Sequence, residues 1–133
     1  MTGYRYELSN AIPVAALMPL FAQTSWAANR LPAAVQAMLD KTLVCLGVWD
    51  GEKLIGFGRA VTDDVFRAVI EDVIVDEAYR GQGVGGELVR QLLQRLIHVE
   101  EIALVCEDHN IAFYEKYGFE RFTMTHMHIW KGG

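Results

Sequence analysis

The sequence predicts a single α/β domain, residues 1–133, in which helices cover a central mixed sheet. Three observations predict this class. Apolar segments of strand length alternate with segments whose apolar residues recur at helical spacing. A length of 133 residues and a hydrophobic fraction of 52% suit one domain with one core. No internal repeat, linker or low-complexity segment divides the chain. The expected order of elements is β-α-α-β-β-β-α-β-α-β-β.

The first half of the chain predicts one strand, two helices and then a hairpin. Ser9 or Asn10 is a suitable N-cap for the first helix. Pro32 is tolerated in the second helix because the first helical turn does not need its N–H. Asp50-Gly51 is typical of the turn in a hairpin. The expected elements are a strand at 4–8, a helix at 11–24, a loop at 26–30, a helix at 31–39, and strands at 42–49 and 54–61.

The second half predicts a core strand, a long amphipathic helix and a mixed C-terminal part. Asp63-Asp64 indicates a turn before the core strand, and Gly118 is expected to end the last helix. One apolar stripe runs along the long helix through Val84, Leu88, Leu92 and Leu96, widened by Val89 and Leu93. The expected elements are a strand at 68–75, a helix at 83–97, a strand at 102–106, a helix at 110–116, and closing strands at 119–123 and 126–130.

Composition excludes several classes of protein. A formal net charge of −5 argues against a nucleic-acid partner, which would need a basic surface. No apolar run approaches the ~20 residues that span a bilayer, and the N-terminus lacks the layout of a signal peptide. We therefore expect a cytoplasmic protein with no membrane partner. Cys45 and Cys106 lie in apolar, strand-like segments and are expected to be buried reduced thiols rather than a disulfide or metal site.

The most informative segment is 73–86, where a short apolar strand leads into a loop with four glycines and then a helix. The first N–H groups of a helix lack intrahelical partners, and the helix dipole adds positive potential at that end. Glycines allow the backbone to approach an anion closely. The segment therefore predicts a site for a phosphorylated cofactor.

The glycines at 81, 83 and 86 also spell the G-x-G-x-x-G of dinucleotide-binding proteins, with Glu101 twenty residues after Gly81. Three observations count against that interpretation. Six positions separate Gly81 from the end of the strand at Val75, a complete βαβαβ half is missing, and the motif follows several strands instead of opening the chain. A P-loop is excluded because no Gly-Lys-Ser/Thr ends the run.

Two motifs together give a more specific interpretation. Arg80-x-x-Gly83-x-Gly85 resembles the Q/R-x-x-G-x-G/A pattern of the GNAT superfamily of N-acetyltransferases, and residues 110–119 resemble its N-x-A-x-x-F/Y-Y-x-x-x-G-F signature. The resemblance covers nearly the whole chain and implies a GNAT-like fold with acetyl-CoA as co-substrate and no metal. The cofactor-binding residues that it implies are Val73, Ile74, Val75, Arg80, Gly81, Gln82, Gly83, Val84, Gly85, Gly86, Asn110, Phe113 and Tyr114.

The resemblance also implies a division of labour at the reacting centre. The strands at 73–75 and 102–106 would separate to admit the pantetheine arm, so that the amide of Ile74 or Val75 can stabilise the oxyanion. Tyr114 is the candidate general acid, since a phenol with a pKa of ~10 is protonated at neutral pH. The alternative role for Tyr114 is that of a core aromatic, as expected for Phe113 and Tyr117. A covalent route through Cys106 is a further alternative.

The general base is left open between Glu71, Asp72 and a water relay. Both carboxylates interrupt an apolar strand, and neighbouring side chains point to opposite faces. At least one is expected to point into a cleft, where burial would raise its pKa. Alternatively, both acids pair with Arg59 or Arg67 and serve the structure.

The acceptor site is expected to include Trp26, Asn29, Arg30 and Phe66, with residues 123–130 beside them. His126 and His128 alternate on one expected strand, which favours an edge strand over a metal site because no third ligand is evident. We expect direct transfer of the acetyl group, in a ternary complex, to an amine of a small molecule or peptide. A non-catalytic acyl-CoA-binding module is the alternative function, and a homodimer is left open.

Overall fold

The computed structural model describes residues 3–132, so the domain bounds predicted at 1 and 133 lie outside the described residues. It has the predicted mixed α/β architecture. Five strands form one sheet in the order β1-β2-β3-β4-β5. Strands β1 to β4 pair antiparallel, and β5 pairs parallel to β4. The elements are β1 (Arg5–Leu8), α1 (Val14–Phe21), α2 (Pro32–Lys41), β2 (Val44–Asp50), β3 (Lys53–Thr62), β4 (Arg67–Val75), α3 (Val84–Arg95), β5 (Glu101–Ala103) and α4 (Ile111–Glu115), with 3₁₀ turns η1 (Glu77–Tyr79) and η2 (Asp108–Asn110).

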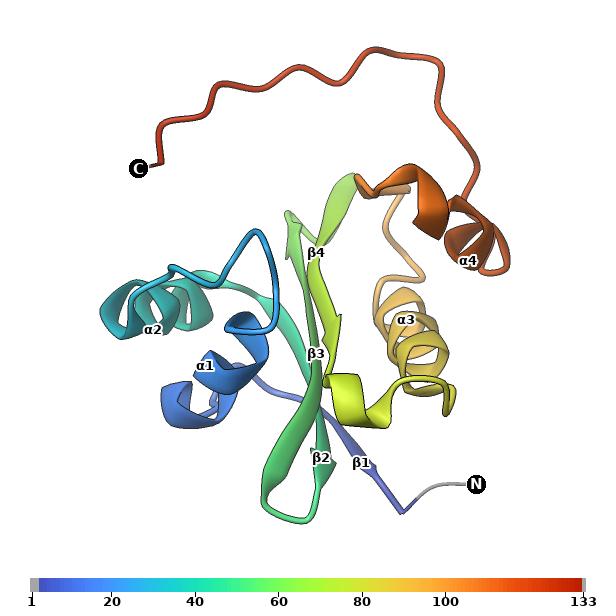
Figure 1. The fold of residues 1–133 in the computed structure, drawn as a ribbon. Coiled ribbons are helices and arrows are strands. Elements are labelled where there is room, and N and C mark those ends of the chain that lie inside the picture. The colour runs from blue at the N-terminus through green and yellow to red at the C-terminus, as the bar shows by residue number, and fades with distance from the viewer. Residues whose placement is uncertain (1–2, 133) are drawn as a thin grey trace.

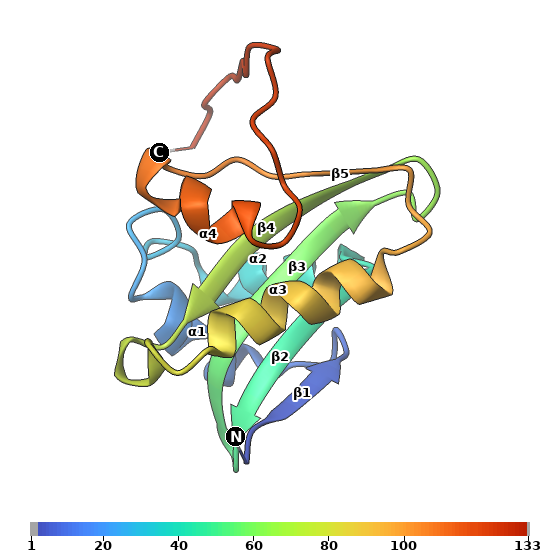
Figure 2. The same cartoon turned by 90° about the vertical axis from the view of Figure 1, so that its right-hand side faces the viewer.

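Helices cover both faces of the sheet, as predicted. Helices α1 and α2 lie on one face (Figure 1), and α3 crosses the other (Figure 2). Phe21 of α1 packs edge-to-face on Phe57 of β3, at 6.0 Å between ring centroids. On the opposite face, a Cβ built on Gly58 would lie 2.8 Å from Leu88 and 3.0 Å from Leu92. The glycine in β3 therefore lets α3 approach the sheet closely.

The first helix is shorter than predicted. It begins at Val14 after Pro13, which occupies the N-cap position without a side-chain cap among the described residues. Because a residue that precedes proline is kept out of the helical region, Ile12 cannot extend the helix backwards. Ser9 instead accepts the N–H of Ala11 through its hydroxyl, at 3.0 Å. Beyond the last helical residue, Phe21, single turns with i→i+3 bonds carry the chain to Thr24.

The two closing strands predicted at 119–123 and 126–130 are wrong. Residues 120–130, which we call the arm, lie outside helices and strands and run away from the body of the protein (Figure 1). Strand β5 is also shorter than predicted and ends at Ala103. The chain leaves the sheet there, so among the described residues no strand lies beside the arm. A strand forms only when its backbone finds such a neighbour.

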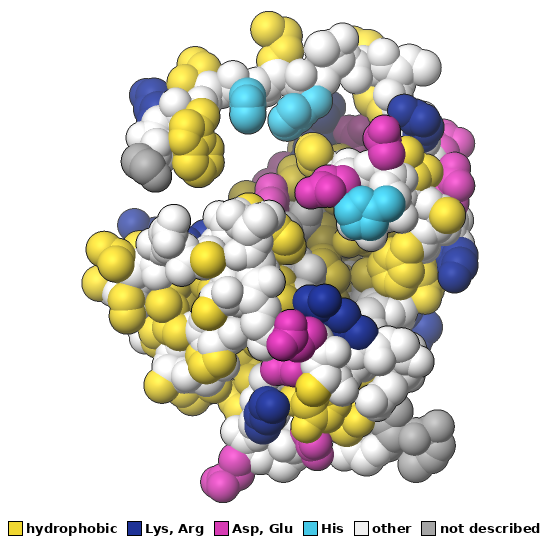
Figure 3. Space-filling view, in the orientation of Figure 1, with side chains coloured by type: hydrophobic (Ala, Val, Ile, Leu, Met, Phe, Trp, Pro, Cys, Tyr) yellow, Lys and Arg dark blue, Asp and Glu magenta, His cyan; other side chains and the backbone are white. Residues whose placement is uncertain are grey.

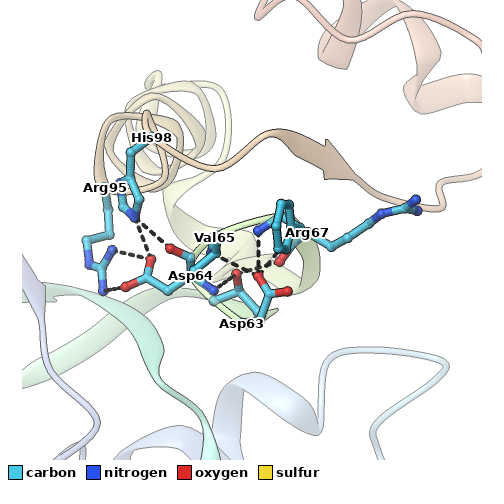
Figure 4. Close-up of polar contacts among 8 residues, drawn as sticks. Asp63, Asp64, Val65, Arg67, Arg95 and His98 are labelled. Atoms are coloured by element: carbon cyan, nitrogen blue, oxygen red, sulfur yellow. Dashed lines mark hydrogen bonds and ion pairs between the residues drawn. The ribbon is translucent and has the colours of Figure 1, made fainter.

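The turn between β3 and β4 is fixed to the end of α3 (Figure 4). Asp63 accepts the N–H groups of Val65, Phe66 and Arg67 through one carboxylate oxygen. Asp64, with a φ of 64°, accepts bonds from Arg95 at 3.0 Å and contacts His98 at 2.8 Å. The backbone N–H of Glu101 then donates to Phe66 at 3.0 Å. This turn therefore sets where β5 begins beside β4.

None of the described helices is long and apolar enough to cross a membrane.

Candidate active site

A β-bulge interrupts β4 where the two predicted acids lie. Arg59 pairs with Glu71 and Phe57 pairs with Ile74, so two residues of β4 face one residue of β3. Asp72 lies in the bulge with a φ of 54°. Such a bulge changes which side chains point to which face. Accordingly, Ile70 packs in the core beneath α3, whereas Ile74 packs in the core beneath α1.

After Val69, just before the bulge, β4 and β5 separate. In the described part of the chain the two strands pair only at 67–69 with 101–103. The separation expected from the resemblance is therefore confirmed, and it leaves the edge of β4 open over 70–75. Successive backbone groups of a strand point to opposite edges. Because the N–H of Asp76 donates to Ile55 of β3 at 2.8 Å, the N–H groups of Val75 and Val73 point to the open edge.

The glycine loop connects this open edge to the N-terminus of α3. Gly81 and Gly83 have φ values of 79° and 85°, a region that a side chain would strain. Gly83 is the N-cap of α3, and no side chain of residues 3–132 caps this helix end. The backbone N–H groups at 83–86 are therefore the helix donors without intrahelical partners. Together with the helix dipole, they make this end suited to an anion.

Neighbouring side chains hold the glycine loop in place. Arg80 donates from Nε to the carbonyl of Val75 at 3.2 Å, so the arginine lies back along the open edge of β4. The hydroxyl of Tyr4 donates to Oε1 of Gln82 at 2.7 Å. At the start of the loop, the side chain of Gln23 accepts the N–H of Glu77 at 2.9 Å. The loop is thus tied to the residue before β1, to the end of β4 and to the turn that follows α1.

Helix α4 packs against the first turn of α3. A Cβ built on Gly85 would lie 3.7 Å from Phe113, and one built on Gly86 would collide with the hydroxyl of Tyr117. The two motifs that are distant in sequence are therefore adjacent in space. Asn110 lies at the N-cap position of α4, but within the described residues its side chain makes no capping bond.

Tyr114 lines a hollow of about 870 Å³ beside β5 and α4, which we call the β5–α4 hollow. Its ring packs edge-to-face on Phe113 and Phe119. Burial, and then the nearby Cys106 thiol, raise the pKa of Tyr114. The phenol therefore stays protonated at neutral pH. Cys45 and Cys106 are both free thiols, and Cys106 is only partly buried.

Asp72 is the centre of a buried ion-pair cluster. Its carboxylate accepts bonds from Arg30 Nη1 at 2.8 Å, Arg59 Nε at 2.8 Å and Trp26 Nε1 at 3.0 Å. Burial alone would raise the pKa of Asp72, but the bonds from the two guanidinium groups hold it below its usual range. The expectation that burial would raise this pKa is therefore wrong for Asp72. The cluster ties the loop at 26–30 to the bulge.

Only some of the predicted acceptor residues come together. Trp26 and Arg30 meet at Asp72, while Asn29 is exposed on the same loop. Phe66 is exposed in the turn between β3 and β4. Glu71 is exposed beside the bulge, and Arg67 pairs with Glu101 at 3.0 Å rather than with either acid. The surface is hollowed beneath the arm (Figure 3).

One feature of the site was not anticipated from the sequence, namely how many side chains bind Asp72. The sequence suggested Arg59 as a partner of the acids, but not that Trp26 and Arg30 bind the same carboxylate. In the register of the sheet Arg59 lies opposite Glu71, yet its side chain bonds to the neighbouring Asp72 in the bulge. His126 and His128 lie on the arm, with 5.8 Å between ring centroids. Among residues 3–132, no group of three or more metal-ligating side chains is placed to hold an ion.

Comparison with known proteins agrees with this geometry. Residues 14–119 match the model of the Acetyltransferase (GNAT) family. The chain is 42% identical over 78 residues to GCN5-related N-acetyltransferase 2, chloroplastic, of Arabidopsis thaliana, which covers 53% of this chain and 30% of that protein. It is 34% identical over 112 residues to a mycothiol acetyltransferase of Corynebacterium efficiens. This matched region covers 80% of this chain and 37% of that protein. The chain thus spans only about a third of the length of these relatives.

A solved structure shows the same fold. A GNAT family acetyltransferase of Streptococcus pneumoniae superposes with a TM-score of 0.83 at 24% sequence identity. The match covers 97% of this chain and 98% of that chain. At this identity the likeness describes the fold, and it extends over nearly every residue described above.

Proposed function

The chain belongs to the GNAT family of acetyltransferases, and on that basis we propose that it transfers the acetyl group of acetyl-CoA to an amine of a small molecule or peptide. The predicted enzyme class, an acyltransferase, is confirmed at the level of the family. The dinucleotide alternative does not hold, because the sheet is mainly antiparallel. The observation that carries the proposal is the open edge of β4. It leads directly into the glycine loop and the N-terminus of α3, where the first N–H groups lack intrahelical partners.

Binding of the cofactor uses two backbone surfaces. The N–H groups at 83–86 would receive the pyrophosphate, where the helix dipole favours negative charge. The groups of Val73 and Val75 that face the open edge would pair with the amides of the pantetheine arm. Since β5 leaves β4 after Val69, the arm fits between the strands without breaking a bond of the sheet. This geometry leads the reactive thioester toward the bulge.

The open edge also narrows the choice of oxyanion donor. Ile74 and Val75 were equal candidates in the sequence, but the N–H of Val75 points to the open edge and that of Ile74 points toward β3. This excludes Ile74 and leaves Val75 of the two, while the N–H of Val73 faces the same edge closer to the bulge. A backbone donor already aimed at the developing charge stabilises the transition state without reorganisation.

Tyr114 would donate the proton to the departing thiolate. Its raised pKa keeps the proton in place until the leaving group needs it. The non-catalytic alternative gives no reason for a phenol in the β5–α4 hollow beside the cofactor strand. The position of Tyr114 therefore favours an enzyme over a binding module.

Glu71 is the better candidate for the general base, acting directly or through water. Asp72 is ionised, but its oxygens are already engaged by Arg30, Arg59 and Trp26. We therefore assign Asp72 a positioning role, in which it holds the acceptor loop and the bulge together. Glu71 is exposed next to that bulge and is free to meet an amine.

A screen of amines with thiol release as the readout tests the proposal. The panel contains polyamines, amino acids, aminosugars and short peptides, each at saturating acetyl-CoA. We expect amine-dependent release of coenzyme A for at least one class, with the acetylated amine identified by mass spectrometry. Binding of coenzyme A without turnover on any amine would favour the non-catalytic module. Binding of NAD in place of coenzyme A would refute the assignment of the cofactor.

A further inference from the structure

Two arginines share one carboxylate where the loop between α1 and α2 meets the bulge of β4. Nη1 of Arg30 and Nε of Arg59 both donate to Oδ2 of Asp72, each at 2.8 Å. Among residues 3–132, no other acid forms an ion pair with either arginine. Because a guanidinium group is always charged at neutral pH, the three side chains together carry one positive charge in excess.

This excess charge lies in a largely buried place. The side chain of Arg59 is 15% exposed, and that of Asp72 is 2% exposed. A charge that is buried without a counter-ion is costly, so buried charges are normally paired. The unmatched positive charge is therefore unfavourable in the protein alone, and a bound anion would relieve that cost.

Most N–H donors of the two guanidinium groups remain unused. Each guanidinium has five N–H donors, and within the described residues each gives one hydrogen bond, to Asp72. Among the described residues that are not exposed, only Trp49 Nε1 is both shut off from water and without a partner. The unused nitrogens of Arg30 and Arg59 therefore reach solvent. A guanidinium fork that is only partly used can bind a second carboxylate or a phosphate.

Neighbouring groups fix the two arginines before any ligand binds. The guanidinium carbon of Arg30 lies 5.0 Å from the centroid of the Phe21 ring, which supports it from below. The indole of Trp26 donates to the other oxygen of Asp72, Oδ1, at 3.0 Å. Groups that are already held in place lose little conformational entropy when a ligand binds. The arginine pair is therefore a preformed receptor for an anion.

This receptor lies next to the place where acetyl transfer is proposed. Asp72 directly precedes Val73, whose N–H faces the open edge of β4, and a strand advances by about 3.3 Å per residue. Arg59 lies opposite Glu71 in the sheet, so their side chains point to the same face. An acceptor can therefore meet Glu71 with its amine and the arginine pair with a group a few bonds away.

We propose that the acceptor amine carries an anionic group, a carboxylate or a phosphate, that binds between Arg30 and Arg59. This inference rests on the proposed function and narrows its substrate to amines with a negative charge a few bonds from the nitrogen. The bound anion balances the second guanidinium as Asp72 balances the first. Polyamines, which carry positive charge alone, would be repelled by the excess charge of the cluster.

Matched pairs of acceptors test the inference on the unmodified chain. Each pair joins an anionic amine with its uncharged analogue: glycine, β-alanine and phenylalanine with their primary amides, and phosphoethanolamine with ethanolamine. We expect a kcat/KM roughly 10–100-fold higher for the anionic member of at least one pair, the range for hydrogen bonds to a charged group. The pair that shows it distinguishes a carboxylate from a phosphate.

The basicity of the amine cannot produce this preference. The negative charge of the acid favours the protonated form of the nearby amine, so the uncharged analogue has the lower amine pKa. The analogue therefore supplies more neutral amine and would react faster without recognition. Equal or faster acetylation of the uncharged member of every pair would overturn the inference and leave the proposed function standing.

Arg30→Gln separates recognition from a structural role. It should lower kcat/KM for the preferred anion roughly 10–100-fold and for the uncharged analogue much less, because only the anion loses a partner. Arg30→Lys keeps the charge without the fork and should restore part of the preference. Arg5→Gln, the same exchange at an exposed arginine of β1, is the control and should keep the full preference. An equal loss for both members of the pair would assign Arg30 to the structure alone and overturn the inference.

A binding measurement keeps the two proposals apart. The indole N–H of Trp26 donates to Asp72, so its NMR signal, assigned from Trp26→Phe, reports on the cluster. We expect the preferred anion to shift this signal saturably and its uncharged analogue to leave it unchanged. Such a shift without acetylation of any amine would refute the proposed function and leave the anion site standing. A signal that no anion shifts would overturn the inference.

Discussion

Asp72→Asn tests most sharply whether Asp72 holds the acceptor loop at 26–30 against the bulge of β4. The carboxylate side chain is 2% exposed and holds two arginines and one tryptophan in place. Asparagine has nearly the same shape and keeps one oxygen acceptor. What it removes is the charge that neutralises the two guanidinium groups, together with at least one charge-assisted hydrogen bond.

The expected loss follows from the burial of each partner. Breaking a buried ion pair by removing one partner costs about 3–5 kcal/mol, because the other charge stays buried. Arg30 keeps a third of its side chain in solvent, so water recovers part of that cost, whereas Arg59 is only 15% exposed. We therefore expect a loss of about 2–3 kcal/mol in the free energy of unfolding. For a chain of this length that corresponds to a melting temperature lower by roughly 10 °C.

The pH dependence of this loss has a definite sign. The pKa of Asp72 is lower in the folded protein than in the unfolded chain, where it is about 3.9. Its contribution to stability is therefore fully present above that pH and is lost as the pH falls through the folded-state value. The difference between the unmodified chain and Asp72→Asn should be largest near pH 7 and should shrink below about pH 4.

Urea unfolding at several pH values measures both the loss in the free energy of unfolding and its dependence on pH. Asp108→Asn serves as the control, because Asp108 is exposed and should leave the midpoint unchanged. Asp72→Asn should also raise the KM for the acceptor amine more than the KM for acetyl-CoA, since the loop at 26–30 loses its anchor. A loss below about 1 kcal/mol, or a difference that does not change with pH, would refute the role given to the cluster.

The remaining predictions concern the acid and the contact between the two motifs. Tyr114→Phe should lower kcat by roughly 10²-fold, which is the usual scale for one acid–base group, and should change the affinity for coenzyme A little. Tyr6→Phe on β1 is the control. Near-normal turnover of Tyr114→Phe would remove Tyr114 from its role. Gly86→Ala should lower stability by about 1–2 kcal/mol, because its Cβ collides with the hydroxyl of Tyr117. Tyr117→Phe in the same chain should restore part of that loss in thermal unfolding, and equal melting temperatures with and without Tyr117→Phe would show that the contact is not the cause.

The parts of the fold that the sequence predicted are those with local signals. The stripe from Val84 to Leu96 has helical periodicity, and α3 buries it. The turns at Gly51 and Asp64 follow from residues that tolerate positive φ, and both have it in the structure. The glycine loop could be predicted because its chemistry lies within one short segment.

The parts that the sequence could not predict depend on residues far apart in the chain. Asp72 receives bonds from Arg30 and Trp26, which lie 42 and 46 positions away, so no local pattern indicates the cluster. The bulge that gives Asp72 its conformation is a mismatch between two strands and has no signature in either alone. The arm has strand-like residues, yet a strand needs a partner edge, and none of residues 3–132 provides one beside it.

The proposed function requires that the open edge of β4 and the first turn of α3 together hold coenzyme A. Amide chemical-shift mapping during titration with coenzyme A tests it most directly. We expect saturable binding of coenzyme A, with the largest shifts at Val73, Val75 and the glycines at 83, 85 and 86. The shift at Ile74 should be smaller, because its N–H faces β3. Shifts centred on another surface, or a response to NAD with none to coenzyme A, would show that this surface is not the cofactor site.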